Sequence, residues 1–213
     1  CASVGMVYWN QRMNQFTGDS KYIDVLERSM YNGALAGVSL AGDRFFYVNP
    51  LESNGDHHRQ AWYGCACCPS QISRFLPSIG NYIYGTSDKA LWVNLFIGNT
   101  TEVTIDGKKV VMKQETDNPR DGLVKLTVTS EQAHGKELRI RIPGWCKSYT
   151  LSVNGNKVDS TTDKGYTVIK EWKTGDLIVL NMDMPVEKVS ADPRVRQNTG
   201  KRALQRGPLG YWL

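Results

Sequence analysis

The chain has 213 residues, of which 40% are hydrophobic and 22% are charged, a composition typical of a globular protein with a sizeable core. The formal net charge of +5 is spread along the sequence, and the longest basic groupings are pairs such as Lys108-Lys109. Because there is no basic stripe, we do not expect a nucleic acid partner. No apolar run approaches the roughly 18 residues of a membrane span, so we expect no transmembrane helix.

Both ends of the chain interrupt a structural pattern. The sequence opens with Cys1-Ala2-Ser3 directly inside an amphipathic segment, and it stops within a predicted strand, residues 207–213, without a polar tail. Ends of complete domains are usually polar and poorly ordered. We therefore expect the chain to be a fragment of a longer protein.

Helical periodicity marks the first part of the chain. Apolar residues at helical spacing predict a helix over residues 4–16, with Gly18 as its C-cap. A second helix, capped by Asp19 or Ser20, is predicted to end near Gly37. The short connection predicts an antiparallel helical hairpin.

A loop and a third helix are expected next. Residues 45–48 predict a short aromatic strand that stops at Pro50. Pro69 is a favourable residue for opening a third helix, whose apolar face continues to about residue 79. Pro77 is expected to kink this helix or to end it early.

From about residue 88 the hydrophobic period changes to the alternation of β-strands. Asp106-Gly107 and Asn154-Gly155 are strong signals for two-residue hairpin turns. Many short strands at this spacing predict a β-sandwich. The fold class is therefore α+β, with a helical part over residues 1–87 and an all-β sandwich over residues 88–213. Further strands are predicted at residues 137–142, 149–153, 166–170 and 177–183.

The cysteines are the most informative residues. Five is an odd number, and three of them lie within Cys65-Ala66-Cys67-Cys68-Pro69, so a fully paired disulfide framework is excluded. At the start of a helix, the unpaired N–H groups and the helix dipole lower thiol pKa values. The cluster therefore favours metal binding or catalysis. Its spacing differs from a zinc ribbon, so further ligands must come from distant segments. The lone Cys146 is interpreted as a small buried hydrophobic residue.

Other polar and aromatic residues have simpler interpretations. Adjacent His57 and His58 lie in a polar loop and are expected to be solvated. Trp62 and Tyr63 either stack on a bound ligand or support the cysteine cluster. Residues at predicted strand ends are interpreted as surface charges: Glu102, Asp117 and Asp121.

Several segments together, in matching order along nearly the whole chain, resemble glycoside hydrolase family 127, which contains retaining β-L-arabinofuranosidases. The resemblance implies that residues 1–87 are the last helices of an (α/α)6 barrel and that residues 88–213 form most of a β-sandwich. The segments are Cys1-Ala2-Ser3-Val4-Gly5, Phe45-Phe46-Tyr47-Val48-Asn49-Pro50-Leu51, Cys65-Ala66-Cys67-Cys68-Pro69, Ile142-Pro143-Gly144-Trp145 and Ala203-Leu204-Gln205-Arg206-Gly207-Pro208-Leu209.

The same resemblance implies roles for individual residues. Cys67 matches the family's nucleophile, and Cys1, Cys67 and Cys68 match zinc ligands. A glutamate ligand and the acid/base glutamate would lie before residue 1. Tyr47 matches a tyrosine near the sugar, and Cys65 is expected to pack beside the cluster. The implied activity is zinc-dependent removal of terminal β-L-arabinofuranosyl residues from an oligosaccharide or glycoconjugate.

Three alternatives stay open at this stage. A relative with the same fold could hydrolyse another rare plant-polysaccharide sugar. The β-rich part could be a non-catalytic carbohydrate-binding module with structural cysteines. A redox or metal-storage protein would also use clustered thiols, although it would leave the sandwich unexplained. Unpaired thiols fit a reducing cytosol and equally a metal-protected site in the periplasm or outside the cell.

Overall fold

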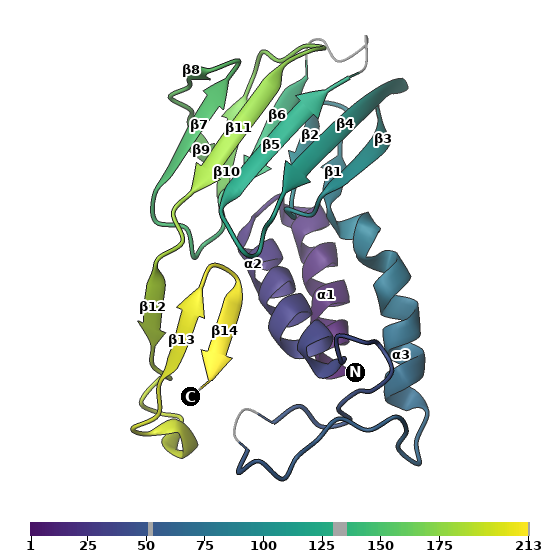
Figure 1. Ribbon diagram of the computed structural model, residues 1–213. Helices are drawn as coiled ribbons and strands as arrows, with labels where there is room; N and C mark the ends of the chain where they lie inside the picture. Colours follow the sequence, from purple (N-terminus) through teal and green to yellow (C-terminus); the bar gives the residue numbers. More distant parts are fainter. Residues whose placement is uncertain (51–52, 130–135, 213) are drawn as a thin grey trace.

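The computed structural model describes residues 1–50, 53–129 and 136–212. Its helices lie on one side of the molecule and two β-sheets lie on the other (Figure 1). Within the described residues, none of the helices is both long and apolar enough to cross a membrane. The division of the chain after residue 87 stays a prediction.

The first two helices form the expected hairpin. Helix α1 (Ala2–Thr17) ends at Gly18, whose left-handed conformation (φ 64°) caps it as predicted. Helix α2 (Lys21–Arg28) is shorter than predicted, because the chain continues as a π-helix, η1 (Ser29–Ala34), and a 3-10 turn, η2 (Leu35–Gly37). The π-helix contains asparagine and glycine, which are weak formers of α-helix.

The third helix begins earlier than expected. Helix α3 (Cys67–Phe75) includes both adjacent cysteines in its first turn, and the 3-10 helix η3 (Leu76–Tyr82) follows it. The change of helix type at Pro77 confirms the predicted early end.

The prediction of a strand at residues 45–48 is wrong, because β-bridge pairing in this segment is limited to one residue. Phe45 forms isolated bridges with Val38 and Gln60, whereas the N–H of Phe46 donates to the carbonyl of Gly37.

Two antiparallel-rich sheets pack face to face, as the sequence predicts. A five-stranded sheet has the order β1-β2-β6-β10-β9, and a six-stranded sheet has the order β3-β4-β5-β11-β7-β8. Their facing side chains form one apolar core, which includes Leu138 and Ile140 from one sheet and Leu126 and Leu180 from the other. The strands of the first sheet are β1 (Tyr84–Thr86), β2 (Ala90–Val93), β6 (Glu137–Arg141), β9 (Thr162–Asp163) and β10 (Tyr166–Ile169).

The two predicted hairpin turns are confirmed. Asp106 and Asn154 both adopt a positive φ of 51°, followed by glycines that also have positive φ, as type I′ turns require. The strands predicted at residues 137–142, 149–153, 166–170 and 177–183 are found within one residue of those bounds. The strands of the six-stranded sheet are β3 (Asn99–Ile105), β4 (Lys108–Thr116), β5 (Leu123–Val128), β7 (Tyr149–Val153), β8 (Asn156–Lys157) and β11 (Leu177–Met182).

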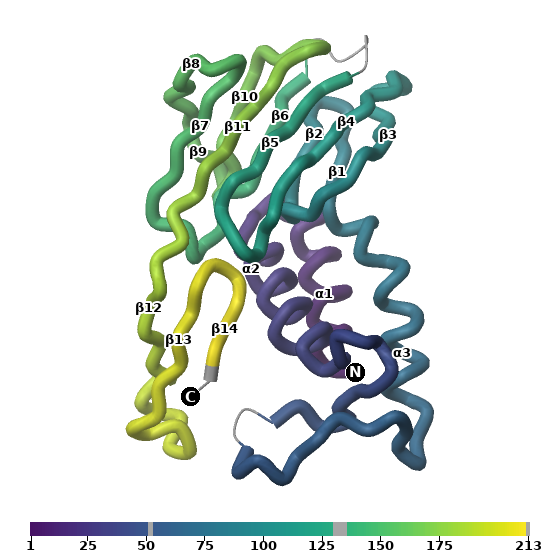
Figure 2. Tube along the Cα trace, in the orientation of Figure 1, coloured from purple at the N-terminus to yellow at the C-terminus, as the bar shows by residue number. Residues whose placement is uncertain are grey.

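A third, small sheet returns the chain toward the helices (Figure 2). Strands β12 (Val186–Val189), β13 (Ala203–Arg206) and β14 (Leu209–Trp212) form it. The side chain of Asn32 in η1 donates to the Pro208 carbonyl at 2.8 Å and accepts from the Gly210 N–H at 2.9 Å. The tip of this hairpin is therefore fixed to the π-helix.

The helices are joined to the five-stranded sheet through buried polar contacts. Arg141 of β6 is fully buried, and it pairs with Asp24 at 2.7 Å and with Glu27 at 2.5 Å, both on α2. Tyr166 of β10 accepts a hydrogen bond from the Asn14 amide of α1 at 3.0 Å. The opposite ends of α1 and α3, which carry the cysteines, lie away from the sandwich (Figure 1).

Candidate active site and metal centre

Two helix N-termini bring the cysteines together. Cys67 and Cys68 occupy the first turn of α3, and Cys1 immediately precedes α1. The N–H of Gly5 donates to the carbonyl of Cys1 at 2.9 Å, so Cys1 is held rigidly by the first turn of its helix. Because α1 packs against α3, residues 66 positions apart in the sequence meet at one place.

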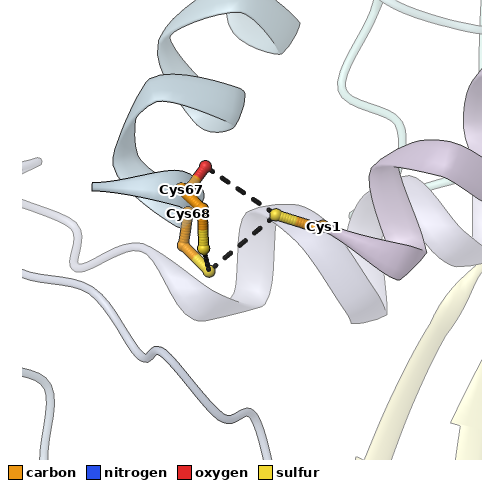
Figure 3. Close-up of side chains that lie close together, drawn as sticks. All are labelled: Cys1, Cys67 and Cys68. Carbon is orange, nitrogen blue, oxygen red and sulfur yellow. Dashed lines mark hydrogen bonds between the residues drawn. The ribbon is translucent and has the colours of Figure 1, made fainter. Parts of the chain in front are cut away.

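The three sulfur atoms form a compact group (Figure 3). Cys1 Sγ lies 4.0 Å from Cys68 Sγ, and Cys67 Sγ lies 3.8 Å from Cys68 Sγ. Cys1 Sγ also lies 3.7 Å from the Cys67 carbonyl oxygen. All three sulfurs are within 4.8 Å of one another. The structure thus brings together the three residues for which a metal-binding role is predicted.

These distances and donor types fit zinc. Tetrahedral zinc with Zn–S bonds of about 2.3 Å separates its sulfur ligands by about 3.8 Å. The two measured sulfur separations of 3.8 and 4.0 Å match that value closely. Three thiolates would leave one coordination position for a further ligand.

Tyr47 contacts the predicted nucleophile directly. Its hydroxyl oxygen lies 3.2 Å from Cys67 Sγ and 3.5 Å from Cys65 Sγ. The hydrogen bond from Tyr47 lowers the pKa of the Cys67 thiol, and the same contact raises the pKa of the Tyr47 hydroxyl. Burial, by contrast, raises the pKa of the Cys68 thiol. At a given pH, Cys67 therefore has the larger thiolate fraction of the adjacent pair.

The remaining two cysteines differ from each other. Cys65 is exposed, and its sulfur lies 3.5 Å from Cys67 Sγ. Cys65 thus lies beside the cluster as expected, although its side chain is exposed. Cys146 packs against the sandwich core as expected, but it is only partly buried, and its thiol donates to the Ser148 carbonyl at 3.1 Å.

A cavity of about 240 Å³ adjoins the sulfur group. It lies between the first turn of α1, the π-helix, the segment around Tyr47 and the first turns of α3. Several of its lining residues are polar and were not identified from the sequence: Ser3, Asn49 and Gln71. Ser3 and Asn49 lie in segments that carry the family resemblance, but neither was assigned a role, and Gln71 lies outside those segments.

The other candidate residues lie outside the sulfur group. His57 is stacked on Phe46 and its Nε2 lies 2.9 Å from the Val48 carbonyl, so it supports the loop and is not simply solvated, whereas His58 is exposed. Tyr63 packs against Tyr47, which favours a supporting role. Trp62 is exposed. The surface interpretation holds for the three exposed carboxylates Glu102, Asp117 and Asp121.

Comparison with known families agrees with this arrangement. The family model described as beta-L-arabinofuranosidase, GH127 catalytic domain, matches residues 1–81, and the GH127 middle-domain model matches residues 90–184. The chain belongs to the GH127 family. The resemblance found in the sequence is therefore confirmed.

Known GH127 proteins match this chain over nearly its whole length. The non-reducing end beta-L-arabinofuranosidase of Bifidobacterium longum subsp. longum is 38% identical over 230 residues, which cover 99% of this chain and 34% of that protein. A solved GH127 beta-arabinofuranosidase superposes with a TM-score of 0.95 at 41% identity, over 99% of this chain and 36% of its own.

A second solved structure, a GH127 beta-L-arabinofuranosidase from Geobacillus stearothermophilus T6, gives a TM-score of 0.92 at 46% identity, over 99% of this chain and 35% of its own. The chain thus spans about a third of the length of these relatives.

Proposed function

We propose that the full-length protein is a zinc-dependent retaining glycoside hydrolase that removes terminal β-L-arabinofuranosyl residues, with Cys67 as its nucleophile. The observation that carries this proposal is the meeting of Cys1 with Cys67 and Cys68 beside a cavity. Membership of the GH127 family and the activity named for its relatives support the sugar specificity.

The residues of this chain have complementary roles in that reaction. The Cys67 sulfur would attack the anomeric carbon, form a carbon–sulfur bond and displace the aglycone oxygen. Water would then break that bond, which returns Cys67 as a thiolate and retains the anomeric configuration. When bound to Cys1, Cys67 and Cys68, zinc would keep the sulfurs deprotonated near neutral pH. Proton transfer is assigned to the glutamate that the family resemblance places before residue 1.

The cavity would bind the sugar ring. Tyr47 lines this cavity, and we propose that it binds the sugar while its hydroxyl contacts Cys67.

The helices of this chain would complete an (α/α)6 barrel in the full-length protein. An apolar face of α1 is exposed, with Met6 at 45%, Trp9 at 64% and Phe16 at 85%. Large exposed apolar patches mark surfaces that another segment or partner covers. The barrel explains this face, because further helices would pack on it.

The test uses the full-length protein and a synthetic aryl β-L-arabinofuranoside. Cys67→Ser should abolish turnover, because a hydroxyl held in place of a thiolate is a far weaker nucleophile at neutral pH. Cys146→Ser is the matched control, since Cys146 lies in the sandwich. Zinc analysis of the purified protein and an NMR assay of the product's anomeric configuration accompany the kinetics. Retained turnover in Cys67→Ser would refute the nucleophile assignment, and sugar binding without turnover would favour a carbohydrate-binding module.

A further inference from the structure

A close approach between two helices lies directly behind the sulfur group. Gly33 of the π-helix η1 faces Ser3 in the first turn of α1. A β-carbon at position 33 would lie 2.6 Å from Ser3 Oγ and 2.8 Å from Ser3 Cβ, whereas ordinary contacts begin at 3.4 Å. The absence of a side chain at Gly33 is therefore what allows these two backbones to approach.

The steric clash between a β-carbon at position 33 and Ser3 cannot be relieved by a side-chain rotation alone. Rotation about the Cα–Cβ bond could remove the Ser3 hydroxyl from the contact, but Ser3 Cβ is fixed to the backbone. A side chain at position 33 would therefore displace the first turn of α1 or the π-helix by several tenths of an ångström. Protein interiors are close-packed, so such a shift passes to neighbouring atoms rather than into empty space.

A displacement of Ser3 would reach Cys1. Both residues lie in one helical turn, in which the N–H of Gly5 bonds to the Cys1 carbonyl. Val4 and Val7 are 2% and 0% exposed and hold the inner face of α1 in the helical core. Because Val4 and Val7 hold the helix in place on the C-terminal side of Ser3, a displacement of Ser3 passes to the N-terminal end of the helix at Cys1.

The metal centre tolerates little movement of this kind. Metal–ligand distances in functional sites lie within about 0.2 Å of their ideal values. The Cys1 sulfur is 4.0 Å from Cys68 Sγ, close to the roughly 3.8 Å of ideal tetrahedral zinc. A shift of several tenths of an ångström exceeds the tolerance of the site, and it would act on Cys1 before Cys67 or Cys68, which belong to another helix.

We infer that Gly33 and Ser3 are positioning residues for the Cys1 thiolate: their direct contact sets the depth at which α1 packs on the π-helix and thereby completes the three-sulfur metal site. This inference rests on the proposed metal centre. It gives the π-helix a function, since π-helical turns within helices often lie at functional sites. It also assigns a role to Ser3 and Gly33, both of which border the cavity.

The test measures metal binding in the full-length protein, independently of sugar hydrolysis. Zn²⁺ affinity is measured by competition with a chromophoric chelator, and Co²⁺ substitution reports the number of sulfur ligands through the thiolate-to-metal absorption. Gly33→Ala should weaken Zn²⁺ binding by about 10–100-fold, the range observed when the support of a metal ligand is lost. The Co²⁺ charge-transfer intensity should fall by about one third, because one of three sulfurs is lost.

Matched variants separate positioning from a general loss of folding. Gly37→Ala lies one turn further along the same wall of the cavity, and its β-carbon would meet nothing within 4 Å, so its metal affinity should equal that of the parent. Ser3→Gly in the Gly33→Ala background removes both clashing atoms and should restore the affinity. Ser3→Ala in that background keeps the Cβ at 2.8 Å and should restore it only in part.

The other outcomes overturn the inference, the enzymatic proposal, or both. The inference is wrong if Gly33→Ala binds Zn²⁺ as tightly as the parent protein. It is also wrong if Gly33→Ala binds Zn²⁺ weakly or unfolds and the added Ser3→Gly substitution does not restore Zn²⁺ affinity. A parent protein that binds zinc but releases no arabinose would refute the enzymatic proposal and leave the Gly33–Ser3 comparison intact. A parent protein without metal affinity would refute both.

Discussion

The buried charge network between the helices and the sandwich gives the strongest stability prediction. Arg141 has no exposed side-chain area, and its guanidinium pairs with Asp24 and with Glu27, whose side chains are 23% and 2% exposed. Arg141→Met keeps the alkyl part of the side chain but leaves the Glu27 carboxylate buried, with the indole N–H of Trp145 as its remaining donor at 3.0 Å. The remaining carboxylate would stay buried with neither water nor an ionic partner. The expected loss in unfolding free energy is therefore about 3–5 kcal/mol.

Two comparisons make this prediction quantitative. Lys113 pairs with Glu115 on the surface, where the side chains are 48% and 52% exposed, so Lys113→Met should cost below about 1 kcal/mol. Adding Glu27→Leu to Arg141→Met removes the stranded carboxylate and should recover more than half of the loss, since an apolar replacement of a buried pair is often neutral.

Urea unfolding, followed by circular dichroism and tryptophan fluorescence, measures these differences. The full-length protein has several domains, so the transition to compare is the one in which the helices separate from the sandwich. An Arg141→Met variant that unfolds like Lys113→Met would show that the network does not hold the two parts together. The reasoning also fails if Glu27→Leu makes the Arg141→Met variant less stable still.

Three further predictions concern the site and the interface. Cys68→Ser should reduce zinc affinity beyond the roughly 10–100-fold that a supporting residue costs, whereas Cys146→Ser should leave it unchanged, as metal analysis of both proteins would show. In the metal-free protein near neutral pH, iodoacetamide should label Cys67 before Cys68, because its lowered pKa gives a larger thiolate fraction while that of Cys68 is raised; peptide mass spectrometry measures the order, and the reverse order contradicts the assignment. Tyr166→Phe should cost about 1–3 kcal/mol in urea unfolding, because the amide oxygen of Asn94 loses its 2.7 Å donor, and a neutral effect would show that this contact is dispensable.

Local features were the most predictable part of the fold. The turns at Asp106-Gly107 and Asn154-Gly155 follow from residues that accept a positive φ, and the strands beside them follow from alternation. The strand predicted around residue 46 failed because a strand needs a partner along its length, and here a single residue, Phe45, finds one. Aromatic composition gives β-propensity but does not supply the partner strand.

The burial of Arg141 could not be read from the sequence. Alternation in β6 places Leu138 and Ile140 in the sandwich core and Arg141 on the opposite face, and an arginine there suggests solvent. The helices cover that face instead, and the acidic partners come from residues more than 100 positions away in the sequence. No local pattern encodes which face of a sheet a distant helix will cover.

The sequence indicates some of the reactive residues of the site but not how distant segments bring them together. Clustered thiols indicated reactivity at Cys67 and Cys68, whereas the role of Cys1 came only from the family resemblance, because its partners are 66 positions away or more. Gly33 is an isolated glycine within a helical pattern, which is the one sequence signal of a close packing contact. The signal does not identify Ser3 as the contact.

Helix α1 connects the proposed metal site at one end of the molecule to the sandwich at the other. Its 16 residues span about 24 Å at 1.5 Å per residue. At its far end, Lys164 of the sandwich donates from Nζ to the Thr17 carbonyl at 2.7 Å, and the Asn14 amide donates to Tyr166. At its near end, Ser3 packs against Gly33 and Cys1 joins the other two sulfurs. An α-helix resists compression along its axis because of its hydrogen bonds, so in the proposed metal site the sandwich would set the axial position of Cys1 and the Gly33 contact would set its depth. Both constraints would act on Cys1, the one member of the three-sulfur group that lies outside α3 and whose position the local sequence around Cys67 and Cys68 leaves undetermined.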